Sequence, residues 1–138
     1  MKKIIFTNGC FDLLHVGHLK VLKEAAKLAK KYNAKLIVGI NSDKSRVEWG
    51  SRLPIIPAVE RKEMLEAIKG VDKVIIHKDA SVYKLVKKLK PFIIVKGDDY
   101  KGKVVGQDLA RVHLVKKTKK KQSTTKIIEK IRKLKIWE

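Results

Sequence analysis

Short apolar runs and amphipathic segments alternate along this 138-residue chain. Five runs are apolar and rich in β-branched residues, as buried strands are, namely residues 4–6, 36–40, 74–76, 92–95 and 112–115. Between them, apolar residues recur at three- and four-residue steps, which predicts helices over 18–32, 59–68 and 82–89. A last helix is expected after the N-cap residues 123–125, with a core side of Ile127, Ile128, Ile131 and Leu134. Residues 41–57 have no sustained period and are expected to form a loop.

The alternation predicts an α/β fold, a Rossmann-like, doubly wound sheet of five parallel strands. A chain of this length has room for one core, so we expect a single domain over residues 1–138. The usual strand order of this fold is 3-2-1-4-5, which makes the first and fourth strands neighbours. Ligands of such sheets bind beyond the carboxyl ends of the strands. The loops after the first and fourth strands are therefore the candidate site.

Charge limits the class of partner. The chain has 34 Lys and Arg against 14 Asp and Glu, a formal net charge of +20. Its hydrophobic fraction of 44% excludes a disordered basic tail, because such chains lack the apolar residues to fold. The charge implies an anionic partner, either nucleic acid or nucleotides and phosphorylated metabolites. A cluster of lysines at 116–121 could serve any of these.

Membrane and redox features are few. No apolar run approaches the ~20 residues needed to cross a bilayer, and residues 1–8 do not resemble a secretory signal. The lone Cys10 can form neither an intramolecular disulfide nor a zinc cage based on Cys. We therefore expect a soluble, cytoplasmic protein without a membrane partner.

The loop after the first strand concentrates polar donors where a helix begins. His15 and His18 are three residues apart and can face one ligand if this turn is helical. Gly17 between them lets backbone approach a bound group, because it has no Cβ. Helix-start N–H groups and imidazoles together favour a phosphate. Two unrelated surface histidines and a turn glycine would produce the same string, and its position after a strand favours the phosphate site.

Gly9-x-Phe11-Asp12-x-x-His15-x-Gly17-His18 resembles the signature of the nucleotidyltransferase superfamily related to class I aminoacyl-tRNA synthetases. The chain is most similar to its small cytidylyltransferase-like members, first the ADP-heptose-forming adenylyltransferase domains and then the glycerol-3-phosphate cytidylyltransferases. The resemblance runs from Lys3 to about Arg132. It includes Asn41-Ser42-Asp43, Arg52 with Pro54, Arg61, Val71-Asp72-x-Val74, Lys96-Gly97-Asp98-Asp99-Tyr100, Val105-Gly106-x-Asp108 and Ser123-Thr124-Thr125.

The resemblance implies that a substrate phosphate attacks the α-phosphorus of a nucleoside triphosphate and releases pyrophosphate. It assigns catalytic roles to His15, His18 and Lys20, and a Mg²⁺ ion that arrives with the triphosphate rather than in a side-chain cage. Nucleotide contacts are expected at Thr7, Asn8, Gly9, Cys10, Phe11, Gly17, Lys96, Gly97, Asp98, Ser123, Thr124 and Thr125. Contacts to the phosphorylated substrate are expected at Asp12, Asn41, Asp43, Arg52 and Arg61.

Several of these residues also have ordinary structural interpretations. Gly97-Asp98 suits a turn, and Asp12 suits a residue that serves the turn alone. Ser123 suits a helix N-cap without a ligand. Arg61 and Lys20 suit a solvated helix face. His77 and His113 end strands with no motif around them and are expected to be structural.

Departures from the family patterns leave base and acceptor open. Thr118 and Lys121 replace an Arg and a Gly of the cytidylyl pattern, whereas Asp98-Asp99 is a cytidylyl feature. The leading hypothesis is adenylyl transfer from ATP to a sugar phosphate. The alternative reaction is cytidylyl transfer from CTP to glycerol 3-phosphate, and the activity of an archaeal-type FAD synthetase is a lesser alternative. A basic nucleic-acid-binding module is the alternative of a different class. It is disfavoured because aromatic residues make up only 6% and no recognition motif is present. Similar enzymes are often dimers, so a homodimer is expected.

Overall fold

A computed structural model describes residues 2–48, 53–98, 102–116 and 123–134. The strands are β1 (Ile4–Gly9), β2 (Lys35–Asn41), β3 (Lys73–His77), β4 (Ile93–Gly97) and β5 (Arg111–Val115). The helices are α1 (Val16–Lys31), α2 (Asp43–Glu48), α3 (Ala58–Glu66), α4 (Tyr83–Leu89) and α5 (Thr124–Lys133). All five strands predicted from apolar runs are therefore present.

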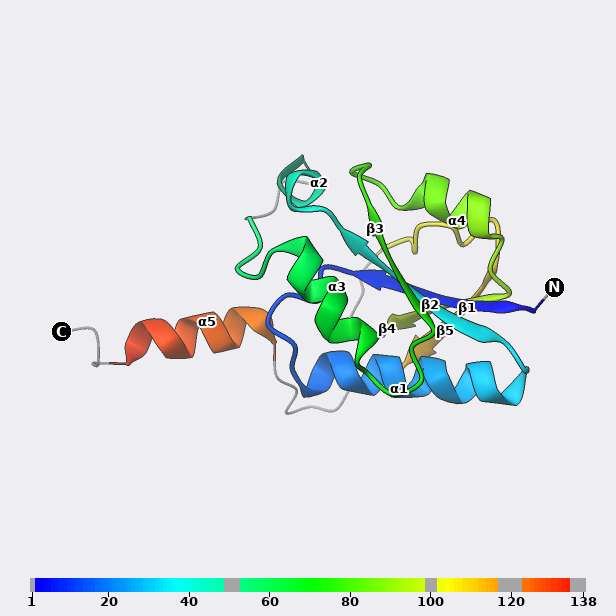
Figure 1. Ribbon diagram of the computed structural model, residues 1–138, viewed down its shortest axis with the longest axis horizontal. Coiled ribbons are helices and arrows are strands. Elements are labelled where there is room, and N and C mark those ends of the chain that lie inside the picture. The colour runs from blue at the N-terminus through cyan, green and yellow to red at the C-terminus, as the bar shows by residue number, and fades with distance from the viewer. Residues whose placement is uncertain (1, 49–52, 99–101, 117–122, 135–138) are drawn as a thin grey trace.

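The strands form one parallel sheet in the order β3-β2-β1-β4-β5, as predicted (Figure 1). β1 lies at the centre, between β2 and β4. It pairs with β2 along its whole length, from Ile4 opposite Lys35 to Gly9 opposite Ile40. With β4 the register holds only Ile5 opposite Ile93 and Phe6 opposite Ile94. The order therefore reverses at the carboxyl ends of β1 and β4, where a doubly wound sheet binds its ligands.

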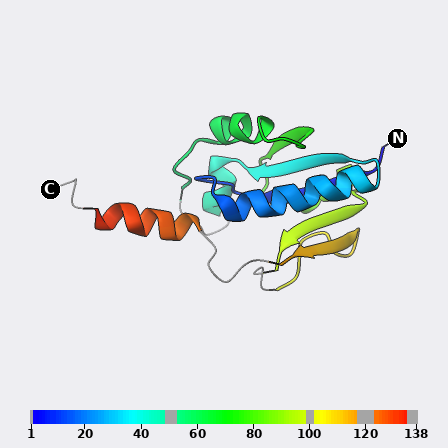
Figure 2. The same ribbon diagram turned by 90° about the horizontal axis from the view of Figure 1, so that it is seen from below.

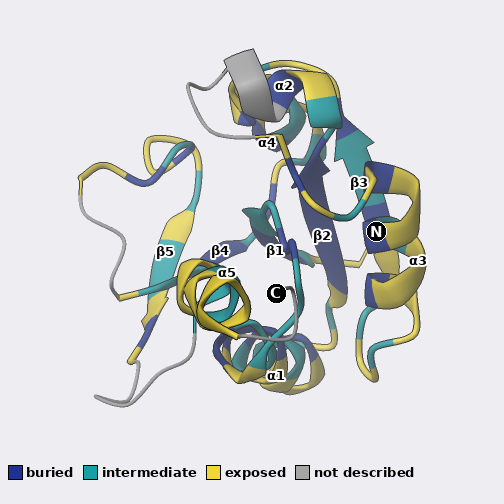
Figure 3. Cartoon of the chain, turned by 90° about the vertical axis from the view of Figure 1, so that its left-hand side faces the viewer, coloured by how far each residue is buried: buried dark blue, intermediate teal, exposed yellow. Residues whose placement is uncertain are grey.

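Helices cover both faces of the sheet (Figures 2 and 3). One face packs against α1 and α3 through a cluster that includes Leu22, Ala25 and Leu65. The other packs against α4 and the segment before β5, through Val86 and Val104. Side chains alternate along a strand, so each strand contributes to both clusters. Two apolar layers thus hold the sheet and leave its carboxyl edge for polar side chains.

The structure corrects the expected loop over 41–57, because α2 occupies part of it. The hydroxyl of Ser42 accepts a hydrogen bond from the backbone N–H of Ser45 at 3.1 Å, and the Ser45 hydroxyl donates to the Ser42 carbonyl at 3.1 Å. These local bonds satisfy donors at the start of the helix. Six residues are too few to show a helical period, so the sequence pattern missed α2.

The structure also corrects the expected packing of α5. None of the described α5 residues is buried, and Ile131 is 41% exposed. The helix projects from the carboxyl edge of the sheet (Figures 1 and 2). Its amphipathic pattern correctly predicted a helix, but the pattern does not say which surface covers the apolar side. Among the described residues, no helix is long and apolar enough to cross a membrane.

Candidate active site

The loop between β1 and α1 follows a constrained path. Phe11 and Leu13 adopt left-handed backbone conformations, with φ of 53° and 50°. The Phe11 ring is buried and lies where a side chain on Gly9 would be, since a Cβ there would be 3.2 Å from the ring. Non-glycine residues in this region of φ are held by their surroundings and concentrate at functional sites. The loop is therefore a fixed platform for the residues that follow it.

The paired histidines cap α1 with their own side chains. The Nδ1 atom of His15 accepts a hydrogen bond from the Gly17 N–H at 3.0 Å, and Nδ1 of His18 accepts from the His15 N–H at 3.3 Å. The two rings are stacked, with centroids 3.8 Å apart. An Nδ1 that accepts carries no proton, so each neutral ring carries its proton on Nε2. Both rings thus present Nε2–H donors at the start of one helix.

The first turn of α5 lies against the same loop. The Thr124 hydroxyl donates to the Asp12 carbonyl at 2.7 Å, across 112 residues of sequence. Ser123 is the N-cap of α5, and its hydroxyl accepts from the Lys126 N–H at 3.1 Å. Neither α1 nor α5 has an acidic residue in its first turn. Two helix N-termini, whose own first turns hold no acidic side chain, therefore lie close to the same loop, and the positive partial charge of a helix start favours a bound anion.

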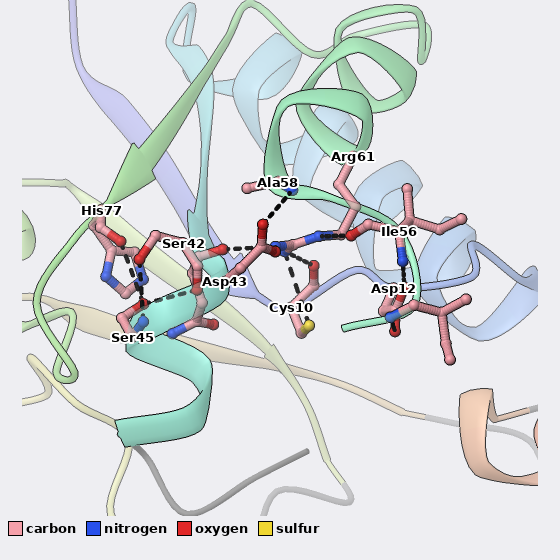
Figure 4. Close-up of polar contacts among 11 residues, drawn as sticks. Cys10, Asp12, Ser42, Asp43, Ser45, Ile56, Ala58, Arg61 and His77 are labelled. Carbon is pink, nitrogen blue, oxygen red and sulfur yellow. Dashed lines mark hydrogen bonds and ion pairs between the residues drawn. The ribbon is translucent and has the colours of Figure 1, made fainter. Parts of the chain in front are cut away.

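Asp12 is a structural junction of this loop. Its side chain is buried, and its two carboxylate oxygens accept from the backbone N–H groups of Ile55 at 2.8 Å and Ile56 at 2.9 Å. The carboxylate thereby fastens the segment before α3 to the loop after β1 (Figure 4). The sequence left open that Asp12 serves only the turn. The structure shows a wider role, because Asp12 also joins two segments that are distant in sequence. Its contact with a substrate stays a prediction.

Arg61 is a second junction, and the alternative of a solvated face is wrong for it. The side chain is 1% exposed. Its guanidinium donates to the carbonyls of Ile56 at 2.8 Å, Cys10 at 2.7 Å and Asn41 at 2.9 Å, and pairs with the Asp43 carboxylate at 2.8 Å (Figure 4). One side chain of α3 therefore holds the ends of β1 and β2 together. The signal that could have found it is an Arg on the same helix face as Ala58 and Leu65.

The end of β4 lies beside the end of β1, as the strand order predicted. The Lys96 ammonium donates to the Asn8 carbonyl at 2.8 Å. Beyond it, the Asp98 N–H donates to the Val115 carbonyl of β5 at 2.9 Å, and the Asp98 side chain is exposed. The register of β1 with β4 has already ended at Phe6, so a side chain rather than the ladder joins the strand ends. Lys96 and the first loop are thus brought to one edge.

The remaining expected site residues differ in how far they are buried. Thr7 is buried within β1, Asn41 is buried at the end of β2, and Gly17 is buried in the first turn of α1. Lys20 and Thr125 are exposed on their helices. Arg52 lies outside the described residues, as does most of the lysine cluster at 116–121. Within the described ranges, no group of three His, Cys, Asp or Glu side chains is placed to hold a metal ion.

Residues 6–136 match the cytidylyltransferase-like family. The chain belongs to this family. It is 47% identical over 135 residues to the bifunctional protein HldE of a Nitratiruptor species, covering 95% of this chain and 28% of that protein. It is 45% identical over 132 residues to the bifunctional protein HldE of Aliarcobacter butzleri, covering 94% of this chain and 27% of that protein. The chain thus spans just over a quarter of the length of these relatives.

A solved structure agrees with this assignment. The lipopolysaccharide core biosynthesis protein of Thermoplasma volcanium is 27% identical, with a TM-score of 0.69 over 88% of this chain and 100% of that one. Membership of the cytidylyltransferase-like family makes the chain a nucleotidyltransferase. Such an enzyme must hold its nucleotide and its acceptor in line and stabilise the charge that develops between them.

Proposed function

We propose that this nucleotidyltransferase transfers AMP from ATP to the phosphate of a small sugar phosphate such as heptose 1-phosphate. An acceptor phosphate oxygen forms a bond to the α-phosphorus, the bond from that phosphorus to the bridging oxygen breaks, and pyrophosphate leaves. The meeting of the α1 and α5 N-termini beside paired imidazoles, fixed by the Thr124–Asp12 hydrogen bond, carries the proposal. The resemblance to ADP-heptose-forming domains supports the choice of ATP and a sugar phosphate, as does the similarity to HldE proteins.

The two helix N-termini suit a triphosphate. Backbone N–H groups and the dipole at a helix start stabilise negative charge where it lies. The Nε2–H groups of His15 and His18 would donate to phosphate oxygens as charge builds on the pentavalent phosphorus and on pyrophosphate. Lys20 follows both histidines in the first turns of α1 and would add a positive charge. Mg²⁺ would enter bound to the triphosphate and neutralise part of its charge.

The acceptor would lie near the ends of β1 and β2. Arg61 and Asp43 hold this region through their mutual ion pair and the bonds of Arg61 to the Cys10 and Asn41 carbonyls. We infer that Arg61 positions these strand ends rather than bonding directly to substrate, since its donors already meet protein oxygens. Arg52 and Asn41 complete the proposed substrate contacts.

A second candidate keeps the reaction and changes both substrates. CTP and glycerol 3-phosphate are favoured by Asp98-Asp99, the cytidylyl form of this motif. A screen of pyrophosphate release decides between them, crossing ATP and CTP with heptose 1-phosphate and glycerol 3-phosphate. ATP with heptose 1-phosphate is expected to turn over fastest, and His18→Ala should lower its kcat ~10²-fold. No turnover with any pair, together with tight, salt-sensitive binding of nucleic acid, would favour the basic binding module instead.

A further inference from the structure

A row of polar side chains lies on the α4 side of the sheet at its carboxyl edge. Phe6 of β1, Ile75 of β3 and Ile94 of β4 pack in the cluster under α4. Because side chains alternate along a strand, residues two or four positions apart face the same side of the sheet. Asn8, His77 and Lys96 therefore follow these three apolar residues, and Asn41 follows Ile37 of β2 on the same face.

His77 is held at the end of this row by its backbone. It pairs in register with Asn41, so these two side chains are neighbours on one face. Its carbonyl accepts from the Ser42 N–H at 3.0 Å and from the Ser45 hydroxyl at 3.5 Å (Figure 4). The end of β3 is thus fixed against the start of α2, and the imidazole has a defined position.

The hydrogen bonds of the His77 ring fix its tautomer. Nδ1 lies 3.0 Å from the Asp79 carbonyl, which can only accept, so Nδ1 carries the proton. Nε2 then holds a lone pair and can only accept. Burial lowers the pKa of His77, the charge of Lys96 lowers it further, and the bond to Asp79 opposes both effects. The ring is therefore neutral near pH 7, with its acceptor at Nε2.

That acceptor has no partner in the part of the chain that the structure describes. His77 is 7% exposed, and its Nε2 atom is buried without a hydrogen bond from any described residue. Buried polar atoms are nearly always satisfied, and leaving one unsatisfied is costly. A lone pair selects a group that carries a proton, and the nearby charge of Lys96 disfavours a second cation. A neutral hydroxyl meets both conditions.

We propose that Nε2 of His77 accepts a hydrogen bond from a carbon-bound hydroxyl of the acceptor substrate, making His77 a specificity residue for polyhydroxylated phosphates. The proposal rests on the proposed function and narrows its acceptor class. His77 takes no part in the transfer itself, so it should affect acceptor binding rather than nucleotide binding.

Nitrogen NMR of the full chain tests this assignment without turnover. The Nε2 resonance of His77, identified by its loss in His77→Gln, should move upfield when glycerol 3-phosphate or heptose 1-phosphate is added. Inorganic phosphate lacks carbon-bound hydroxyls and should leave the resonance in place. No movement with either polyol phosphate overturns the proposal, as does an equal movement with inorganic phosphate. A resonance already shifted in the free protein and unchanged by ligand indicates a resident water and also overturns it.

Kinetics provide the second readout. His77→Leu should raise KM for the acceptor about 5-fold, the loss expected for one neutral hydrogen bond, and leave KM for ATP within about 2-fold. His77→Gln retains an acceptor and should recover part of the loss. His113→Gln, on β5 beside Glu24, is the matched control and should change neither KM. An unchanged acceptor KM in a folded His77→Leu protein, verified by its melting temperature, overturns the role of His77.

The two proposals fail in distinguishable ways. A wild-type protein that transfers no nucleotide from ATP or CTP contradicts the proposed function, whereas the His77 resonance still reports hydroxyl binding. If the protein transfers nucleotide but the His77 resonance does not move, the proposed function stands and only the specificity role of His77 is contradicted.

Discussion

The hydroxyl of Thr124 donates a 2.7 Å hydrogen bond to the carbonyl of Asp12 and joins the first turn of α5 to the loop after β1. This contact brings the N-termini of α1 and α5 to one place. Since no described residue of α5 is buried, a polar contact in its first turn has more weight in placing the helix than it would in a helix packed on the core. The proposed triphosphate site depends on this placement.

Thr124→Val should therefore weaken nucleotide binding without unfolding the protein. Valine keeps the shape of the side chain but removes the donor, and a neutral hydrogen bond is worth ~1 kcal/mol. We expect KM for the nucleotide to rise about 5-fold, measured by pyrophosphate release. Thr124→Ser keeps the hydroxyl and should restore the wild-type value. Equal KM values for the Val and wild-type proteins would show that the tether does not matter for binding.

His15 has a capping role and a proposed chemical role, and two substitutions separate them. Asn is a good N-cap, so His15→Asn should keep the melting temperature close to wild type and lower kcat ~10²-fold. His15→Ala loses both roles and should also cost ~1 kcal/mol of unfolding free energy. Thermal unfolding and steady-state rates on the same preparations measure the two effects. A fully active His15→Asn protein would restrict His15 to capping.

Arg61→Lys should destabilise the fold despite keeping the charge. The guanidinium contacts carbonyls of three segments and the Asp43 carboxylate, and an ammonium cannot reproduce this planar fork. The loss of one hydrogen bond to a charged group typically costs ~1.5–3 kcal/mol. Urea denaturation measures the change in the free energy of unfolding. The exposed Lys69 provides the control, because Lys69→Ala should stay within about 0.5 kcal/mol of wild type. A small loss for Arg61→Lys would mean that the junction is dispensable.

His77 should make the fold sensitive to mild acid. Its pKa in the folded protein is lowered from 6.5, mainly by burial. Below pH 6.5 the unfolded chain therefore binds a proton that the folded protein does not, so stability is lost as pH falls from 6.5 toward the folded pKa. His77→Leu removes this linkage and should show a smaller drop in melting temperature between about pH 7.5 and about pH 5.5. The same drop in both proteins would show that His77 is not the cause of the acid sensitivity.

Local patterns were sufficient for the sheet. Apolar runs such as Leu36–Ile40 predicted strands because parallel strands are buried on both faces. The alternation with helices predicted a doubly wound sheet, and the usual strand order of that fold is the one observed. The first loop was also accessible, since His15, Gly17 and His18 are close in sequence and follow a strand. A short helix and the packing of an exposed helix were harder to predict. α2 has only six residues, and the apolar side of α5 gave no information about what it contacts.

Contacts between distant segments were decided by the tertiary structure. The sequence placed an Arg at position 61 and an Asp at position 12, but did not show that one joins two strand ends or that the other fastens a segment 43 residues away. The orphaned Nε2 of His77, buried among the described residues, is likewise invisible in a strand-end histidine. Hydrophobic periodicity reports which face of an element is buried, because burial repeats along the chain. A polar contact has no such period, so its partner is known only when the fold brings the two groups together.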